Sequence, residues 1–247
     1  MANWSDPRSN AAAFQQADVR TGAYDAGLRR YMLSVYNYMS SAVLLSGLVA
    51  MFFAMGGDNS PAAHILLGGG ILKYVIMFAP LGFIMAMSFG LSRMSDATLQ
   101  AVFWGFAVVM GLSLSSVFLA YSGTSIAQSF FATAAAFAGL SLFGYTTKRD
   151  LSAMGAFLVM GLIGLIVAML LNLWFQSGAF ALAISLVGVV IFAGLTAYDT
   201  QRTKSMYAYV AGTGAEKRTA IMAATNLYLD FVNMFLFLLR IFGNARN

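Results

Sequence analysis

One acidic residue interrupts an apolar stretch near the C-terminus. Residues 219–239 contain a single charged side chain, that of Asp230, about halfway along. An ionisable residue inside a membrane-crossing helix costs about 2.5–3.5 kcal/mol on insertion scales, so such residues commonly mark ion or proton pathways. Asn226 and Asn233 lie on the same helical face as Asp230. Because lipid would leave this polar stripe without hydrogen-bond partners, we expect it to face the interior of a helical bundle.

A second carboxylate, that of Asp199, directly follows the uncharged residues 151–198. Thr196 lies on its helical face, and no Gly or Pro occurs between Asp199 and Gly212, so a helix can continue past it. If the chain turns back at residues 212–215, Asp199 and Asp230 lie at similar distances from the turn. At 1.5 Å per residue they then reach a similar depth in two antiparallel helices.

Two carboxyl groups at one depth can do more than either alone. They can share a proton and titrate in coupled steps, and they offer oxygen ligands to a hard cation such as Ca²⁺. Plainer interpretations also exist: Asp230 as a protonated hydrogen-bond partner between helices, and Asp199 as a solvated residue at the membrane surface. Arg93 ends an apolar stretch on the same side. It is either a snorkelling anchor or a partner that pairs with the acids and closes a path.

The elements that must position these residues are membrane-spanning helices. Hydrophobic residues make up 60% of the chain and charged residues 9%, whereas soluble domains average about 25% charged. The composition therefore predicts an all-α polytopic membrane protein. Cysteine is absent, which excludes disulfides and thiol chemistry. The net charge of +5 comes from scattered Lys and Arg, so we expect the lipid bilayer, and not nucleic acid, as the partner.

Charge-free stretches of about 20 residues each predict seven spans. Residues 1–30 are polar and lack the plan of a cleaved signal peptide, so they are expected to form a flexible cytoplasmic tail. Residues 31–243 are expected to form one seven-helix transmembrane domain. The uncharged stretches are 31–57, 74–92, 97–147 divided at 122–125, 151–198 divided near 172–178, and 219–239 interrupted by Asp230.

The distribution of basic residues predicts the orientation. Of the 14 Lys and Arg, all except Lys73, Arg240 and Arg246 lie in the first 30 residues or in links on one side of the predicted membrane. Cytoplasmic loops carry the excess of Lys and Arg. We therefore expect a cytoplasmic N-terminus, a C-terminus on the other side, and, for a compact chain without cysteine, a bacterial inner membrane.

The C-terminal motif resembles that of a known family. Residues 227–235, Leu-Tyr-Leu-Asp-Phe-Val-Asn-Met-Phe, followed by Leu-Leu-Arg-Ile-Phe-Gly at 238–243, are similar to the signature of the transmembrane Bax inhibitor motif family. Residues 198–201, Tyr-Asp-Thr-Gln, resemble its sixth-helix motif. The resemblance covers about residues 30–243. It implies six helices around a central seventh helix.

The resemblance also implies a pH-sensitive calcium leak channel. Asp199 and Asp230 would act as proton sensor and transient calcium contact, and Arg93 as the gating partner. Asn226, Asn233 and Thr196 would supply a supporting polar face. Calcium would be the permeant ion, and no resident cofactor is expected.

The sequence lacks the motifs of several known classes of membrane enzyme and of retinal proteins. Intramembrane aspartyl proteases need Gly-x-Gly-Asp and Pro-Ala-Leu motifs, and zinc proteases need His-Glu-x-x-His; none of these occurs in the sequence. The last span has no lysine for a retinal Schiff base. We therefore expect no enzyme. The competing function is that of a non-transporting membrane partner that modulates a membrane-bound quality-control protease, as some bacterial family members do.

Overall fold

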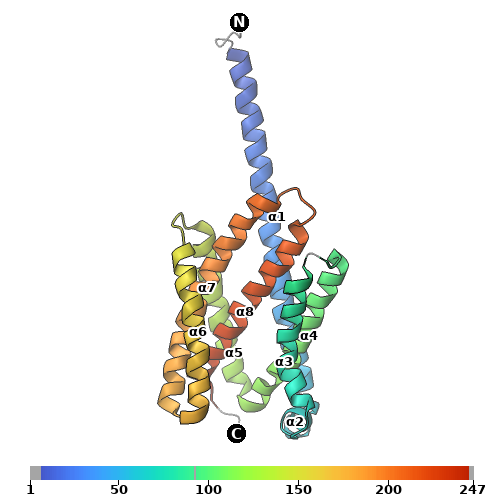
Figure 1. Cartoon of the computed structure of the whole chain (residues 1–247), viewed down its shortest axis with the longest axis vertical. Coiled ribbons are helices and arrows are strands. Elements are labelled where there is room, and N and C mark those ends of the chain that lie inside the picture. Colours follow the sequence, from blue (N-terminus) through green and yellow to red (C-terminus); the bar gives the residue numbers. More distant parts are fainter. Residues whose placement is uncertain (1–6, 92, 245–247) are drawn as a thin grey trace.

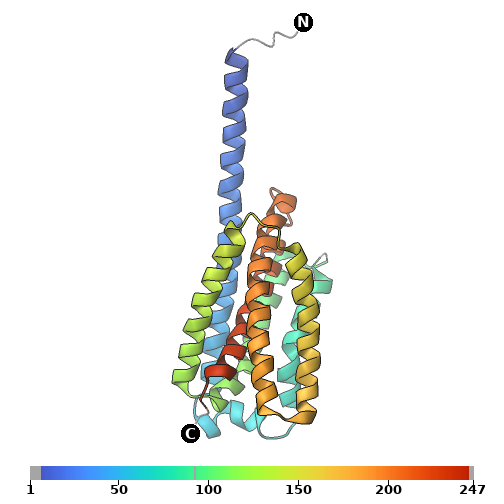
Figure 2. The same ribbon diagram turned by 90° about the vertical axis from the view of Figure 1, so that its left-hand side faces the viewer.

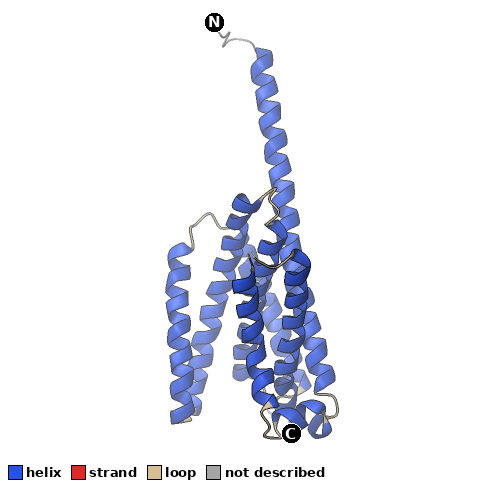
Figure 3. Ribbon diagram, turned by 45° about the vertical axis from the view of Figure 1, so that its right-hand side comes forward, coloured by secondary structure: helices blue, strands red, loops and turns tan. Residues whose placement is uncertain are grey.

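The protein is described by a computed structural model that covers the backbone of residues 7–91 and 93–244, and side chains from residue 24 onward over the same ranges. Within these ranges every regular element is a helix and none is a strand (Figure 3). The all-α prediction is therefore confirmed. The helices are α1 (Pro7–Phe53), the 3₁₀ turn η1 (Gly57–Asn59), α2 (Pro61–Leu66), α3 (Leu72–Gly90), α4 (Asp96–Ala120), α5 (Gly123–Thr146), α6 (Ser152–Phe175), α7 (Gly178–Val210) and α8 (Glu216–Phe242).

Seven of the described helices are long and apolar enough to cross a membrane. They are α3 to α8 and the part of α1 from Tyr24 to Phe53. The predicted count and the predicted divisions near residues 122–125 and 172–178 are confirmed. Several breaks are fixed by serine caps. For example, the Ser122 hydroxyl accepts a hydrogen bond from the Ser125 N–H at the start of α5, which satisfies a donor that the helix itself leaves free.

Helix α8 occupies the centre of the bundle. In α8, 67% of the membrane-crossing stretch is buried, against 17% to 33% in the other six helices. It packs mainly against α7, α1, α5 and α4. Figures 1 and 2 show α8, in red, running through the middle of the molecule. The prediction of six helices around a central C-terminal helix is confirmed.

Helices α3 and α6 are the most peripheral. Each has only 17% of its membrane-crossing stretch buried. The main neighbour of α3 is α4, and that of α6 is α7. Figure 1 shows the two helices on opposite flanks, with α8 between and behind them. Their outward faces carry large apolar side chains that only lipid can cover.

The first 30 residues differ from the flexible segment that the sequence suggested. Helix α1 is continuous from Pro7 through residue 30, and it projects beyond the bundle in Figure 1. Its lower part is packed: Leu28 is buried, and the rings of Tyr24 and Tyr31 lie 5.2 and 5.3 Å from that of Tyr207. Ala, Gln and Arg are good helix formers, so polarity alone did not mark the end of the helix. Residues 1–6 lie outside the described part of the chain.

The seven crossings give the bundle two distinct ends. The N-terminal end carries the projecting part of α1 and the links α3–α4, α5–α6 and α7–α8. The C-terminal end carries α2, the links α4–α5 and α6–α7, and the end of the chain (Figure 1). Which end faces the cytoplasm stays a prediction from the positions of Lys and Arg.

Candidate ion site

The structure brings the two aspartates together. Helices α7 and α8 are antiparallel neighbours joined by a turn in which Gly212 adopts φ 72°. The carboxyl groups of Asp199 and Asp230 lie close enough to interact directly. A proton on one of the two groups would allow a hydrogen bond between them. Asp230 is only 4% exposed, whereas Asp199 is half-buried.

A close contact between α5 and α7 helps to hold Asp199 in place. A Cβ atom on Gly144 would lie 2.2 Å from the backbone oxygen of Ala197, so only glycine lets these two helices approach so closely. One turn further, the Thr200 hydroxyl donates to the Ser141 Oγ at 3.3 Å. Helix α7 therefore presents Asp199 toward α8 from a fixed position.

The opposite face of α8 is anchored by a buried hydroxyl network. The hydroxyl of Tyr228 lies 2.7 Å from the Ser46 Oγ of α1. Ser46 is also within 2.8 Å of two carbonyl oxygens, those of Ala42 and of Ala107 in α4. These contacts tie α8 to α1 and α4 two residues before Asp230. In the sequence, the only sign of this network is a serine and a tyrosine inside apolar spans, and their pairing depends on how the helices pack.

A cavity of about 860 Å³ lies between α6, α7 and α8 and contains both aspartates. We call it the site cavity. Its α8 wall follows one helical stripe from Asn226 to Arg240. Fourteen residues at 1.5 Å each extend about 21 Å, roughly two thirds of the 30 Å hydrocarbon thickness of a bilayer. The polar residues that line it are Ser152, Asp199, Arg202, Asn226, Asp230, Asn233 and Arg240.

One oxygen in the site cavity is left without a donor. Apart from the pairing with Asp199, the buried Oδ2 of Asp230 has no hydrogen-bond partner in the part of the chain that the structure describes. Buried polar atoms in native proteins are nearly always satisfied by protein, water or an ion. Asn233 does not help, because its Nδ2 donates to the Leu229 carbonyl at 2.8 Å. Oδ2 of Asp230 is therefore a buried acceptor that can still take a hydrogen bond or a ligand.

The residues present suit a passing cation better than a stored one. Ca²⁺ prefers six to eight oxygen ligands. The site cavity offers two carboxyl groups and the amides of Asn226 and Asn233. Nowhere in the described residues do three or more His, Cys, Asp or Glu side chains gather as a metal would require. The donor set therefore fits brief contact with a hydrated cation.

Arg93 is not brought to the acidic pair. It lies in the link between α3 and α4, exposed, with its backbone N–H bonded to the Gly90 carbonyl at 2.9 Å. It does not line the site cavity. The link that carries Arg93 follows α3, and the main neighbour of α3 is α4. The basic residue near the pair is Arg202, one turn beyond Asp199, which acts electrostatically on that carboxyl and lines the cavity.

Thr196 also differs from its expected place. Its side chain is fully buried, and its hydroxyl donates to the Phe192 carbonyl of its own helix at 2.8 Å. It does not line the site cavity. Asn226 and Asn233 do line it, so the polar face consists of the two asparagines without the threonine. Threonine in a membrane helix can satisfy its hydroxyl on the preceding turn, which makes its position in the sequence a weak signal.

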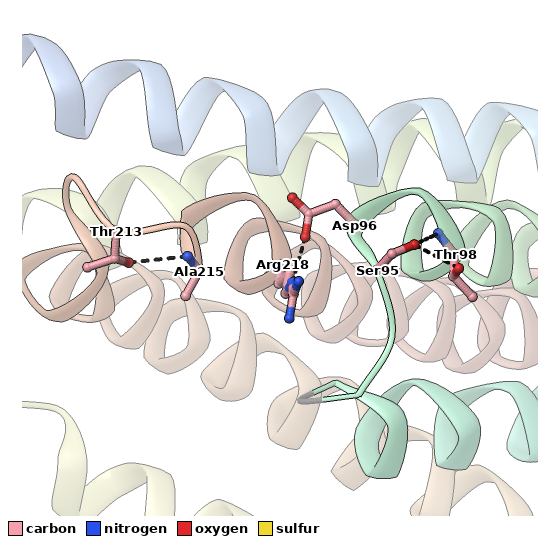
Figure 4. Close-up of polar contacts among 6 residues, drawn as sticks. All are labelled: Ser95, Asp96, Thr98, Thr213, Ala215 and Arg218. Carbon is pink, nitrogen blue, oxygen red and sulfur yellow. Dashed lines mark hydrogen bonds and ion pairs between the residues drawn. The ribbon is translucent and has the colours of Figure 1, made fainter.

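Both ends of α8 are tied to the α4–α5 pair. At the N-terminal end Arg218 forms an ion pair with Asp96 at 2.5 Å, beside the Ser95 cap of α4 (Figure 4). At the other end the Asn244 N–H donates to the Ser125 Oγ at 3.0 Å. The ion pair is partly exposed, so it contributes about 0–1 kcal/mol. It helps to fix the position of α8, the helix that carries Asp230, relative to α4.

Comparisons with known proteins agree with this architecture. The family profile Bax1-I, described as "Inhibitor of apoptosis-promoting Bax1", matches residues 28–247. A protein of Rickettsia prowazekii is 48% identical over 91% of this chain and 93% of its own length. A Caulobacter vibrioides protein is 43% identical over 93% and 94%. The inner membrane protein YbhL of Escherichia coli K12 is 40% identical over 90% of this chain and 94% of its own. With its seven apolar helices, this chain is an integral membrane protein and belongs to the Bax1-I, or Bax inhibitor-like, family.

Proposed function

We propose that the protein is a pH-sensitive calcium leak channel whose aspartate pair is both proton sensor and transient cation contact. The observation that carries this proposal is the adjacent pair of Asp199 and Asp230 inside a cavity that follows α8 from Asn226 to Arg240. Ionisable groups at such depth are costly, so they persist mainly where ions or protons pass.

The charge of the pair decides what it can bind. With one shared proton it carries a single negative charge. Loss of that proton leaves two close carboxylates in a poorly solvated site, where a divalent cation can neutralise both. Binding of a second proton removes the charge and releases the cation. Because proton and cation compete for the same oxygens, flux depends on pH.

We assign the role of charge partner to Arg202 in place of Arg93. Arg202 lies beside Asp199 at the N-terminal end of the site cavity. Its guanidinium stabilises a single negative charge on the pair and opposes the approach of a second cation from that end. Arg93, exposed in its link, has the position of an anchor at the membrane surface.

Calcium flux into liposomes that contain the purified protein tests the proposal. We expect flux that changes from acidic to mildly alkaline pH, and none in liposomes without protein. Asp58→Asn is the matched control, because Asp58 is an exposed acid outside the bundle core and its loss should leave the profile unchanged. Absence of protein-dependent flux at every pH would refute the channel.

One observation favours the alternative, a non-transporting partner that modulates a membrane quality-control protease. The backbone of helix α1 projects well beyond the other helices of the bundle (Figure 1). The same liposomes separate the two functions, since a pure interaction protein conducts nothing. Co-purification of a membrane protease with the full chain, lost when residues 1–23 are removed, would then support the alternative.

We further propose a bacterial inner membrane location with the N-terminus in the cytoplasm. The relatives reported above are bacterial, and one is an inner membrane protein. The basic residues concentrate at the N-terminal end of the bundle. A cytoplasm-active reporter at the N-terminus and a periplasm-active reporter at the C-terminus should both be active. Two cytoplasmic termini would contradict a full crossing by α8.

A further inference from the structure

The two halves of the site cavity have different chemistry. The aspartates, Arg202 and the two asparagines lie toward the N-terminal end. Beyond Asn233 the lining is apolar until Arg240 is reached at the C-terminal end. The apolar section consists of Leu165, Met169, Phe192, Leu236 and Phe237. A hydrated ion that has reached the acidic pair must therefore cross this section to leave at the other end.

Phe237 narrows that section from a fixed position. Its side chain is 4% exposed, and its ring is stacked on that of Phe192 with centroids 5.9 Å apart. A Cβ atom on Gly188 would lie 2.7 Å from the Phe237 ring, so the ring fits into a notch that exists because residue 188 has no side chain. The ring therefore packs closely against α7 and presents an apolar surface to the site cavity.

Arg240 covers the Phe237 ring on the side of the C-terminal end. Its guanidinium carbon lies 5.5 Å from the ring centroid, within the range of a cation–π contact. The side chain is exposed and borders the site cavity. No acidic residue forms a salt bridge with it in the part of the chain that the structure describes. Its positive charge is therefore not neutralised by a neighbour.

We propose that Phe237 and Arg240 close the cavity at the C-terminal end, and that Arg240 is a specificity-determining residue that opposes cations at this mouth. This inference rests on the proposed function. The apolar ring offers a hydrated ion no replacement for its water ligands, and the guanidinium repels a divalent cation twice as strongly as a monovalent one. At about 5 Å in a water-like dielectric, that repulsion corresponds to roughly a tenfold lower local concentration of Ca²⁺.

The first experiment measures calcium flux in proteoliposomes for Arg240→Gln. We expect flux to rise about tenfold and its pH dependence to remain, because the aspartate pair is intact. Lys73→Gln is the matched control. Lys73 is a cation at the same end, with its Nζ 4.9 Å from the Tyr74 ring, but it does not line the site cavity.

The outcomes separate this inference from the function on which it rests. pH-dependent flux in the wild type with no difference between Arg240→Gln and Lys73→Gln leaves the channel standing and overturns the role of Arg240. An unchanged flux would return Arg240 to the simpler role of a cation at a helix C-terminus. Absence of flux in the wild type refutes the channel and with it the cation preference.

The second experiment tests the closure without measuring flux. The chain has no cysteine, so Asn233→Cys creates a single thiol between the acidic pair and the apolar section. A membrane-impermeant thiol reagent should label it from the N-terminal end and not from the C-terminal end. Adding Phe237→Leu with Arg240→Gln should make it reactive from the C-terminal end as well.

Phe235→Leu is the matched control for the second experiment, because Phe235 is a buried α8 phenylalanine that packs with Val117 away from the site cavity. It should leave the labelling one-sided. The leucine substitutions keep an apolar side chain at each position, so the fold should survive. Equal labelling of Asn233→Cys from both ends in the otherwise unchanged protein would overturn the closure.

Discussion

Helix α8 carries polar groups on two faces, and the two faces differ in how those groups are satisfied. On one face the Tyr228 hydroxyl meets Ser46, which in turn bonds to carbonyls of α1 and α4. On the other face the Oδ2 of Asp230 has no partner apart from Asp199 within the described residues. Both groups are expensive to bury. We call the face with Tyr228 the satisfied face, and it packs against α1 and α4. We call the face with Asp230 the unsatisfied face, and it borders the site cavity, where an ion or proton can reach the free carboxyl oxygen.

The largest expected effect comes from removing charge on the unsatisfied face. Asp199→Asn and Asp230→Asn each keep the volume of the side chain and its capacity for hydrogen bonds. We expect each to flatten the pH dependence of calcium flux while the protein still folds. The double variant should be no worse than the more severe single variant, because one coupled unit is lost in either case. Wild-type pH profiles in both single variants would show that the aspartates are structural.

A smaller effect on flux is expected when the positive charge beside the aspartate pair is removed. Arg202→Gln removes the cation that acts on Asp199, so a severalfold change in flux and a displaced pH profile are expected. Arg93→Ala should leave both unchanged, because Arg93 is exposed and does not line the site cavity. An increased leak in Arg93→Ala at neutral pH, with normal insertion, would instead restore Arg93 as the gating partner.

Substitutions on the satisfied face should change stability and not the pH profile. Ser46→Ala leaves the buried Tyr228 hydroxyl without its hydrogen-bond partner and should lower the free energy of unfolding by about 1–3 kcal/mol. Tyr228→Phe leaves Ser46 with two carbonyl acceptors, so it should cost only about 1 kcal/mol. Unfolding of both variants in detergent measures the difference. A flattened flux profile in Tyr228→Phe would mean that the two faces of α8 are not independent.

The smallest effect is expected at the end of α8. Asp96→Asn breaks the ion pair with Arg218 shown in Figure 4. Both side chains are partly exposed, so the loss should be at most about 1 kcal/mol and should shrink further in high salt. Thermal unfolding at low and high salt checks this. A large loss of stability that salt does not reduce would indicate that this contact controls the packing of α8 more strongly than its exposure suggests.

The sequence was sufficient to predict the features that follow from the geometry of individual helices. Charge-free stretches set the seven spans, because the hydrocarbon layer accepts only long apolar segments with satisfied backbones. The constant rise of a helix placed Asp199 and Asp230 at one depth on either side of the turn near Gly212. Helical periodicity put Asn226, Asp230 and Asn233 on one face, and the structure keeps all three on the wall of the site cavity.

Features that depend on contacts between helices were decided only by the tertiary structure. The family resemblance implied Arg93 as the gating partner, but Arg93 lies in the link that follows α3 and does not line the site cavity, whereas Arg202 does. Thr196 shares a spacing with Asp199, yet its hydroxyl is satisfied inside its own helix. The notch at Gly188 of α7, which receives the ring of Phe237 of α8, joins residues of two helices. Periodicity specifies the direction of a side chain from its own axis, whereas its neighbours follow from how the helices pack against one another.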